Sequence, residues 1–219
     1  MKKFNILDAA ALVILLLPAA YLAYIYPTLP ASVPVHFGLN GNPDRYGTKG
    51  EFSGVVYILM GVSAFAYLLL KFIPAIDPKK TAKIGEPVFQ KIALAMVLFL
   101  AALSISIIYS TIQHSFKIDK LVLPLAGLLF AFIGNLMHNI KPNYFAGVRT
   151  PWTLEDPDTW RATHRLAGKL WFGGGIFATI AVLVLPVEAG LIVFISMITL
   201  LALIPVVYSY TYYKKHQLK

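Results

Sequence analysis

Six separate stretches of this sequence are each long and apolar enough to cross a lipid bilayer. A helix needs about 20 apolar residues to span the hydrocarbon core. Because lipid offers the backbone no hydrogen-bond partners, each crossing segment has to form a helix. The sequence therefore predicts an all-α integral membrane protein with six transmembrane helices, at Leu7–Tyr26, Ser53–Ile76, Phe89–Ile112, Leu121–Asn139, Leu170–Leu185 and Gly190–Tyr212.

Composition agrees with this class. Hydrophobic residues make up 58% of the chain and charged residues 13%, and 219 residues leave no room for a large separate soluble domain. The absence of cysteine excludes disulfides, thiolate metal sites and a cysteine nucleophile. Lys2 and Lys3 before the first apolar stretch resemble a signal peptide, but the stretch is too long and ends without a small-residue cleavage site. We interpret it as a retained first span.

The basic residues predict the orientation, since loops on the cytoplasmic side carry an excess of lysine and arginine. With the N-terminus inside, all but four of the 19 lysines and arginines fall on the cytoplasmic side, the exceptions being Arg45, Lys49, Lys117 and Lys120. An even number of spans then places both termini in the cytoplasm, in the plasma membrane. Topology and contact with anionic lipid explain the net charge of +9, so no direct nucleic-acid partner is predicted.

The spans are informative through what they lack. No charged residue lies near the middle of any span, whereas ion-coupled transporters usually carry such groups at membrane depth. The H-E-x-x-H and G-x-S-x-G motifs and an intramembrane aspartate pair are also missing, so the chemistry of the standard intramembrane proteases is absent. Within the fifth span, the run Gly173–Gly175 predicts close packing against a neighbouring helix.

The first long loop, 27–52, is predicted to be ordered and extracytoplasmic. Residues 33–37 alternate as in a short strand, and Asn40-Gly41 favours a tight turn. On a structural interpretation Asp44 caps the turn and pairs with Arg45 or Lys49. On a functional one the loop is a ligand- or toxin-facing surface; one histidine with one or two carboxylates is a weak metal signal, and no metal site is predicted. The candidate binding residues are His36, Asn40, Asp44 and Arg45.

The second long loop, 140–169, is predicted to be cytoplasmic. Asp156 followed by Pro157 is typical of a helix start, with a side-chain cap and then proline at the first helical position. From there an interfacial helix can run straight into the fifth span. Helical spacing gives this helix two faces, a basic one with Arg161, Arg165 and Lys169 and another with Trp160, Thr163, His164, Ala167 and Trp171.

Two interpretations of this loop stay open. In one it is a membrane anchor, because the basic face suits phospholipid headgroups and the tryptophans suit the interfacial belt. In the other, His164 and Arg149 belong to a polar pocket closed by the turn 147–152, which could bind a carboxylate, a phosphate or a partner peptide. The candidate binding residues are Asn143, Gly147, Arg149, Thr150, Pro151, Trp152, Trp160, Thr163, His164 and Arg165.

Both loops resemble known sequence signatures. The stretch Asn143–Leu154, together with Trp160 and Thr163–Lys169 and preceded by Gly134-Asn135, resembles the signature of the SdpI family of bacterial and archaeal membrane proteins. The loop from Leu29 to Gly47 resembles a module of unknown function that often forms the N-terminal part of such proteins. The resemblance divides the chain into a two-helix unit at 1–76 and a four-helix SdpI-like region at 77–219.

The resemblance implies immunity to a secreted toxic peptide, and signalling through a small regulator held at the membrane. The outer loop would then face the toxin and the cytoplasmic loop the regulator. Two alternatives remain: a membrane-surface enzyme acting on lipid or peptide, with His164 as the acid–base group and Arg149 as the anion clamp, and a peptide transporter. The first hypothesis is favoured, and no catalytic residue and no cofactor are predicted.

Overall fold

The computed structural model describes residues 4–38, 41–79, 86–112 and 119–217. Six of its helices are long and apolar enough to cross a membrane, which confirms the predicted fold class. The elements in chain order are α1 (Ile6–Ile25), a short 3-10 turn η1 (Tyr26–Thr28), β1 (Val33–Phe37), β2 (Pro43–Gly47), α2 (Lys49–Ile76), α3 (Glu86–Ile112), α4 (Asp119–Met137), α5 (Pro151–Glu155), α6 (Pro157–Val184) and α7 (Val187–Gln217).

Several helices begin earlier than the predicted spans because polar caps, not hydropathy, decide where a helix starts. Thr48 caps α2 through a reciprocal pair of hydrogen bonds with Glu51, so the helix begins at Lys49, four residues before the predicted span. Asp156 caps α6 as predicted, and the helix then continues without a break to Val184. The fifth span and the loop helix are therefore one rod of 28 residues.

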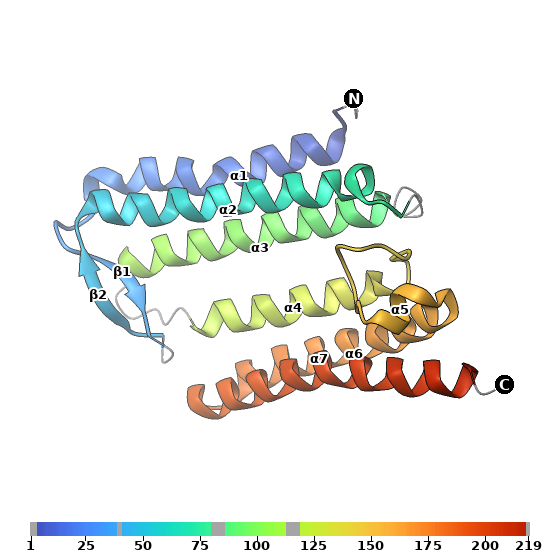
Figure 1. Cartoon of the computed structure of the whole chain (residues 1–219). Coiled ribbons are helices and arrows are strands. Elements are labelled where there is room, and N and C mark those ends of the chain that lie inside the picture. Colours follow the sequence, from blue (N-terminus) through green and yellow to red (C-terminus); the bar gives the residue numbers. More distant parts are fainter. Residues whose placement is uncertain (1–3, 39–40, 80–85, 113–118, 218–219) are drawn as a thin grey trace.

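The long helices form two groups of three, with α1, α2 and α3 on one side and α4, α6 and α7 on the other (Figure 1). The closest contact is between α4 and α6, where glycines let the backbones approach. A Cβ added at Gly134 would lie 2.4 Å from the amide nitrogen of Phe172, and one at Gly175 would lie 2.6 Å from that of Ala131. Gly173 does not contribute, since an added Cβ would meet nothing within 4 Å.

The chain's non-helical parts lie at opposite ends of the bundle (Figure 1). Strands β1 and β2 form an antiparallel hairpin at one end. Both termini, α5 and the irregular segment between α4 and α6 lie at the other end. The structure thus separates the two long loops as predicted, while the division of the chain at residue 77 stays a prediction.

A buried ion pair joins α1 to α2 near the end that carries the termini. The Asp8 carboxylate is only 4% exposed, and its Oδ1 accepts hydrogen bonds of 2.6 Å from both Lys71 Nζ and Tyr67 Oη. Its Oδ2 accepts the backbone amide of Asn5, the N-cap of α1. One side chain therefore closes the cap and fixes how the first two helices meet.

Removing the cation of this pair should destabilise the fold. In a Lys71→Met variant the Asp8 carboxylate stays buried without its counter-charge, so we expect the free energy of unfolding in detergent to fall by about 3 kcal/mol. The double variant with Asp8→Asn should recover part of that loss, because no charge is left buried. Lys214→Met, at an exposed lysine, is the control. An unfolding midpoint unchanged by Lys71→Met would contradict this account.

Candidate functional site in the loop between α4 and α6

The loop after α4 is folded around one asparagine. Asn143 is fully buried, and its amide group donates to the carbonyl oxygens of Lys141 and Ala146, at 2.9 and 3.0 Å. Its Oδ1 accepts the backbone amides of Phe145 and Ala146, at 2.8 and 2.7 Å. Both donors and both lone pairs of the side chain are used. Asn143 therefore holds the turn and is not available to a ligand.

Gly147 lets this turn close over His164. Its φ of +105° is a conformation that side-chain-bearing residues rarely adopt. A Cβ at this position would lie 2.2 Å from His164 Nε2. The next residue, Val148, donates its amide to that nitrogen at 3.2 Å. Two independent features therefore require glycine at position 147: the positive φ of the backbone and the close approach of the His164 imidazole.

His164 is buried, and both of its ring nitrogens are engaged. Nδ1 lies 2.9 Å from the carbonyl oxygen of Trp160, one helical turn earlier, and Nε2 accepts the amide of Val148. These partners assign a neutral ring with the proton on Nδ1. Neither nitrogen has a free lone pair or proton for acid–base chemistry, so this geometry does not support His164 as a catalytic group.

Trp160 is a core residue and not a lipid anchor, which corrects the anchoring interpretation. It is 1% exposed, its ring stacks on His164 with centroids 4.0 Å apart, and Nε1 donates to the carbonyl oxygen of Ile140 at 2.9 Å. The predicted division of α6 into two faces is confirmed, since Thr163 and Ala167 are buried beside it while Arg165 is exposed. The face of α6 that carries Trp160 and His164 therefore packs against the loop and does not meet lipid.

The stretch after Val148 forms α5 and packs on the last helix. Thr150 caps α5 with Thr153 at the third position, and Pro151 occupies the first turn, where its missing amide costs nothing. The indole Nε1 of Trp152 donates to Ser209 Oγ on α7, and its ring meets Tyr210 edge-on with centroids 5.2 Å apart. These residues therefore tie the loop to α7.

Asp156 shows why α6 begins where it does. Burial would raise the pKa of its carboxyl group, but hydrogen bonds from the Thr159 hydroxyl and from the amides of Thr159 and Asp158 outweigh that effect. The pKa of Asp156 therefore lies below its ordinary value. The cap is ionised at neutral pH, and its contribution to stability is lost only as the pH falls through this lowered pKa.

Asp77 and Lys79, which follow the end of α2, bind the loop between α4 and α6. Neither residue is predicted from the sequence to be part of this site. Asp77, 7% exposed, accepts the amide of Tyr144 at 2.7 Å and that of Lys79 at 2.6 Å. Lys79 Nζ donates to the carbonyl oxygen of Leu154 and lies 5.2 Å from the centre of the Tyr144 ring. Asp77-Pro78 is a common turn sequence and gives no sign of a binding role, so these contacts can be found only in the fold.

The structure does not bring Arg149 and His164 into one pocket. Arg149 is exposed, and its Nη1 donates to the carbonyl oxygen of Tyr144 at 2.7 Å on the outer side of the loop. His164 instead contributes to a cavity of about 550 Å³, whose other walls include the basic side chains of Lys79, His138, Lys141 and Arg161. Arg165 lines a smaller cavity of about 250 Å³ with His138 and Lys169. Such walls suit anionic groups.

The buried hydroxyl of Thr163 has no hydrogen-bond partner among the described residues. It is fully enclosed, so it is not a ligand-facing group. Of the predicted loop residues, Asn143, Trp160, Thr163 and His164 are therefore buried inside the loop, and the exposed Gly147 closes the turn over His164. Arg149 and Arg165 face outward and remain candidates for binding.

At the other end of the molecule the hairpin presents an exposed contact between a histidine and an aspartate. His36 Nδ1 lies 2.6 Å from Asp44 Oδ1, with both side chains more than half exposed. Asp44 thus pairs with His36, whereas the sequence suggested a pairing with Arg45 or Lys49. Arg45 is exposed opposite His36 in the strand register, while Asn40 lies outside the described residues.

Apolar packing fixes the hairpin on the helices. Leu29 and Val33 are buried in one cluster with Phe52 and Val56 of α2 and Ile108 of α3. His36, Asp44 and Arg45 therefore project from a base that is packed against the helices. Sequence alternation predicted the first strand correctly, over Val33–Phe37.

Adding one methyl group at Gly147 should loosen the loop. We expect Gly147→Ala to lower the free energy of unfolding by at least about 2 kcal/mol, from backbone strain and the collision with His164. Limited trypsin digestion in detergent should then cleave faster after the exposed Arg149. Gly173→Ala is the matched control, since its Cβ would meet open space. Equal cleavage rates in wild type and Gly147→Ala would contradict the proposed geometry.

Comparison with known proteins finds similarity in both halves of the chain. Residues 139–209, which contain the loop, all of α6 and most of α7, match the model of the SdpI/YfhL protein family. Residues 13–61, which contain the hairpin, match a domain of unknown function, DUF1648. The chain is 28% identical to Immunity protein SdpI of Bacillus subtilis (strain 168) over 192 residues, covering 87% of this chain and 88% of that protein.

No solved structure matches this chain. The family match begins at the end of α4 and takes in the folded loop with the two helices that it contacts. The chain thus has six helices that can span a membrane, its C-terminal part is similar to the SdpI/YfhL protein family, and its N-terminal part is similar to the DUF1648 domain.

Proposed function

We propose that this protein gives its cell immunity to a secreted antimicrobial peptide, by binding and without catalysis. Similarity along 87% of the chain to a protein named for immunity supports this role. The geometry of His164 also favours binding, because both ring nitrogens are engaged within the fold. The His164–Arg149 pair on which an enzyme would depend is not assembled.

The proposal places the hairpin outside the cell and the folded loop in the cytoplasm. The distribution of lysine and arginine supports this sidedness, because 15 of the 19 fall in sequence segments that are predicted to be cytoplasmic. A peptide arriving from outside would then meet the DUF1648 hairpin first. The opposite end would present the SdpI-family loop to proteins of the cytoplasm.

The hairpin is suited to recognising a peptide. His36, Asp44 and Arg45 offer donors and acceptors of both charges on its exposed surface, and Tyr46 is 59% exposed beside them. Buried packing beneath the strands holds these groups in place, so that little entropy is lost when a partner binds. We therefore assign the toxin-facing role to this surface.

The loop surface is suited to a protein partner. Tyr144 and Phe145 are 46% and 38% exposed, next to the exposed Arg149. Aromatic residues and arginine are enriched at protein interfaces, where they supply much of the binding energy. We propose that this patch (Tyr144, Phe145 and Arg149) binds a cytoplasmic regulator and so relays the presence of toxin.

Survival of producing cells tests the immunity role. We expect expression of the chain in a sensitive bacterium to raise survival at least tenfold against one member of a panel, which includes the source organism's culture supernatant and purified secreted antimicrobial peptides. A triple variant, His36→Ala with Asp44→Ala and Arg45→Ala, should lose most of this protection at an unchanged level in the membrane.

Phe145→Ser is the matched variant on the other side. It should keep the protection but lose cross-linking of the loop to a cytoplasmic protein. Survival equal to that of the empty vector against every member of the panel would overturn the immunity proposal. Full protection by the triple variant would overturn the assignment of the hairpin.

A further inference from the structure

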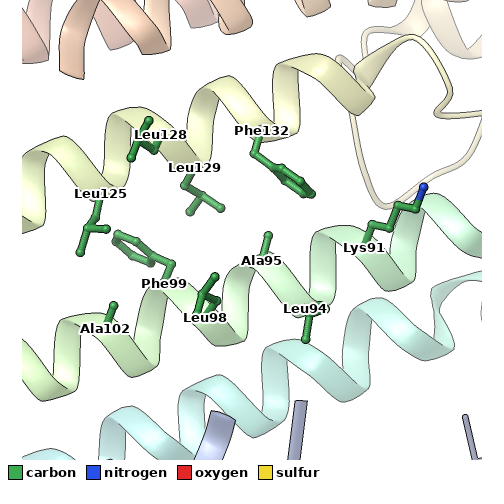
Figure 2. A pocket seen from close by; sticks show the side chains of 10 residues that line it. All are labelled: Lys91, Leu94, Ala95, Leu98, Phe99, Ala102, Leu125, Leu128, Leu129 and Phe132. Atoms are coloured by element: carbon green, nitrogen blue, oxygen red, sulfur yellow. The ribbon is translucent and has the colours of Figure 1, made fainter. Parts of the chain in front are cut away.

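An apolar groove of about 420 Å³ lies between α3 and α4, along the boundary between the two helix groups (Figure 2). Leu98 and Phe99 line it from α3, and Leu125 and Phe132 line it from α4. Leu98 is 57% exposed and Phe132 is 40% exposed, so the groove opens on the surface that faces lipid in a membrane. One charged residue, Lys91, lies at its end.

The groove is about as long as one leaflet is deep. Its α3 wall runs from Lys91 to Ala102, a rise of about 16 Å at 1.5 Å per residue. The hydrocarbon core is about 30 Å thick, so this wall reaches about the middle of the bilayer. Lys91 lies near the start of α3, at the end of the molecule that carries both termini (Figure 1).

The walls differ from those of a helix–helix contact in this protein. Where α4 meets α6, Gly134 and Gly175 bring the backbones together. Where α4 faces α3, leucines and phenylalanines leave a channel, and the two helices contact each other less extensively. Long flexible side chains suit an acyl chain better than they suit the close approach of another helix.

We propose that this groove binds one anionic phospholipid of the leaflet on the side of the termini. Its acyl chain lies along the apolar walls, and its phosphate is held by the Lys91 ammonium. Lys91 is exposed, and none of the ion pairs found among the described residues includes it. The aliphatic stem of Lys91 can lie against the acyl chain, and its ammonium group can lie at the interface beside the anionic headgroup.

The bound lipid connects the two helix groups. It contacts α3 on one side and α4 on the other, so it stabilises the assembled form by mass action. This inference is independent of the immunity role, since it concerns the bilayer and neither loop. It makes the stability of the protein depend on the charge of the surrounding lipid.

The test uses the full chain in detergent with phosphatidylglycerol or phosphatidylcholine carrying the same acyl chains. Native mass spectrometry measures retained lipid, and thermal unfolding measures its effect. We expect one phosphatidylglycerol to be retained and to raise the unfolding midpoint more than phosphatidylcholine does. Lys91→Gln should weaken binding of phosphatidylglycerol about fivefold, to the level of phosphatidylcholine.

Three controls separate the parts of the proposal. Lys214→Gln, another exposed lysine on the same side, should keep the preference for phosphatidylglycerol. Ala95→Trp, which fills the groove, should abolish retention of both lipids. Glycerol 3-phosphate, which lacks acyl chains, should not raise the midpoint.

The proposal is overturned if Lys91→Gln keeps the preference for phosphatidylglycerol, or if Lys214→Gln loses it equally. It is also overturned if glycerol 3-phosphate reproduces the stabilisation, because the site would then be a phosphate site without a chain. Lys91→Gln leaves the groove walls intact, so the headgroup test remains valid even if the tryptophan variant does not fold.

Discussion

Lipid forms no hydrogen bonds with a peptide backbone, and the rest of this structure follows from that constraint. Each of the six apolar stretches has to be helical, and every turn that is not helical has to lie at an end of the bundle. The hairpin and the folded loop accordingly occupy opposite ends. The two surfaces that are free to vary in chemistry are therefore separated by the full length of the helices.

The two ends are stabilised in different ways. The hairpin rests on an apolar cluster around Val33 and Phe52, so its polar groups stay at the surface. The loop between α4 and α6 is held by directional hydrogen bonds centred on Asn143 and His164. A buried network of this kind tolerates little change, because an unmade bond leaves a desolvated polar group.

The loop also joins the two helix groups. Asp77 and Lys79 at the end of α2 bind the backbone of the loop, and Trp152 binds α7 on the other side. At the level of the bilayer the contact between the groups is looser, along the groove lined by Leu98 and Phe132. The loop between α4 and α6 therefore lies where a shift of one helix group against the other would change its shape.

Much of this could be predicted from the sequence where the signal is local. Hydropathy gave the six spans, Asp156-Pro157 gave the start of α6, and helical spacing gave its two faces. What each face contacts is not a local property. One of the two interpretations placed Trp160 at the membrane interface, where tryptophan is common, yet its hydrogen-bond partner Ile140 lies 20 residues earlier. Partners so distant in sequence become neighbours only in the fold.

The same limit explains the ion pairs and the predicted pocket. Asp8 and Lys71 lie 63 positions apart, so the local sequence around either residue does not predict the bond between them. Arg149 and His164 looked like partners because both are polar residues of one loop. The positive φ of Gly147 turns the chain so that the Val148 amide, and not the Arg149 side chain, reaches the imidazole.

The sidedness of the two surfaces is the claim on which the proposed roles depend, and thiol labelling tests it most directly. The chain has no cysteine, so single cysteines at the exposed positions Tyr46 and Asp158 give an unambiguous signal. In intact cells a membrane-impermeant maleimide should label Tyr46→Cys at once, and should label Asp158→Cys only after permeabilisation. Labelling of Asp158→Cys in intact cells, with Tyr46→Cys protected, would contradict the account.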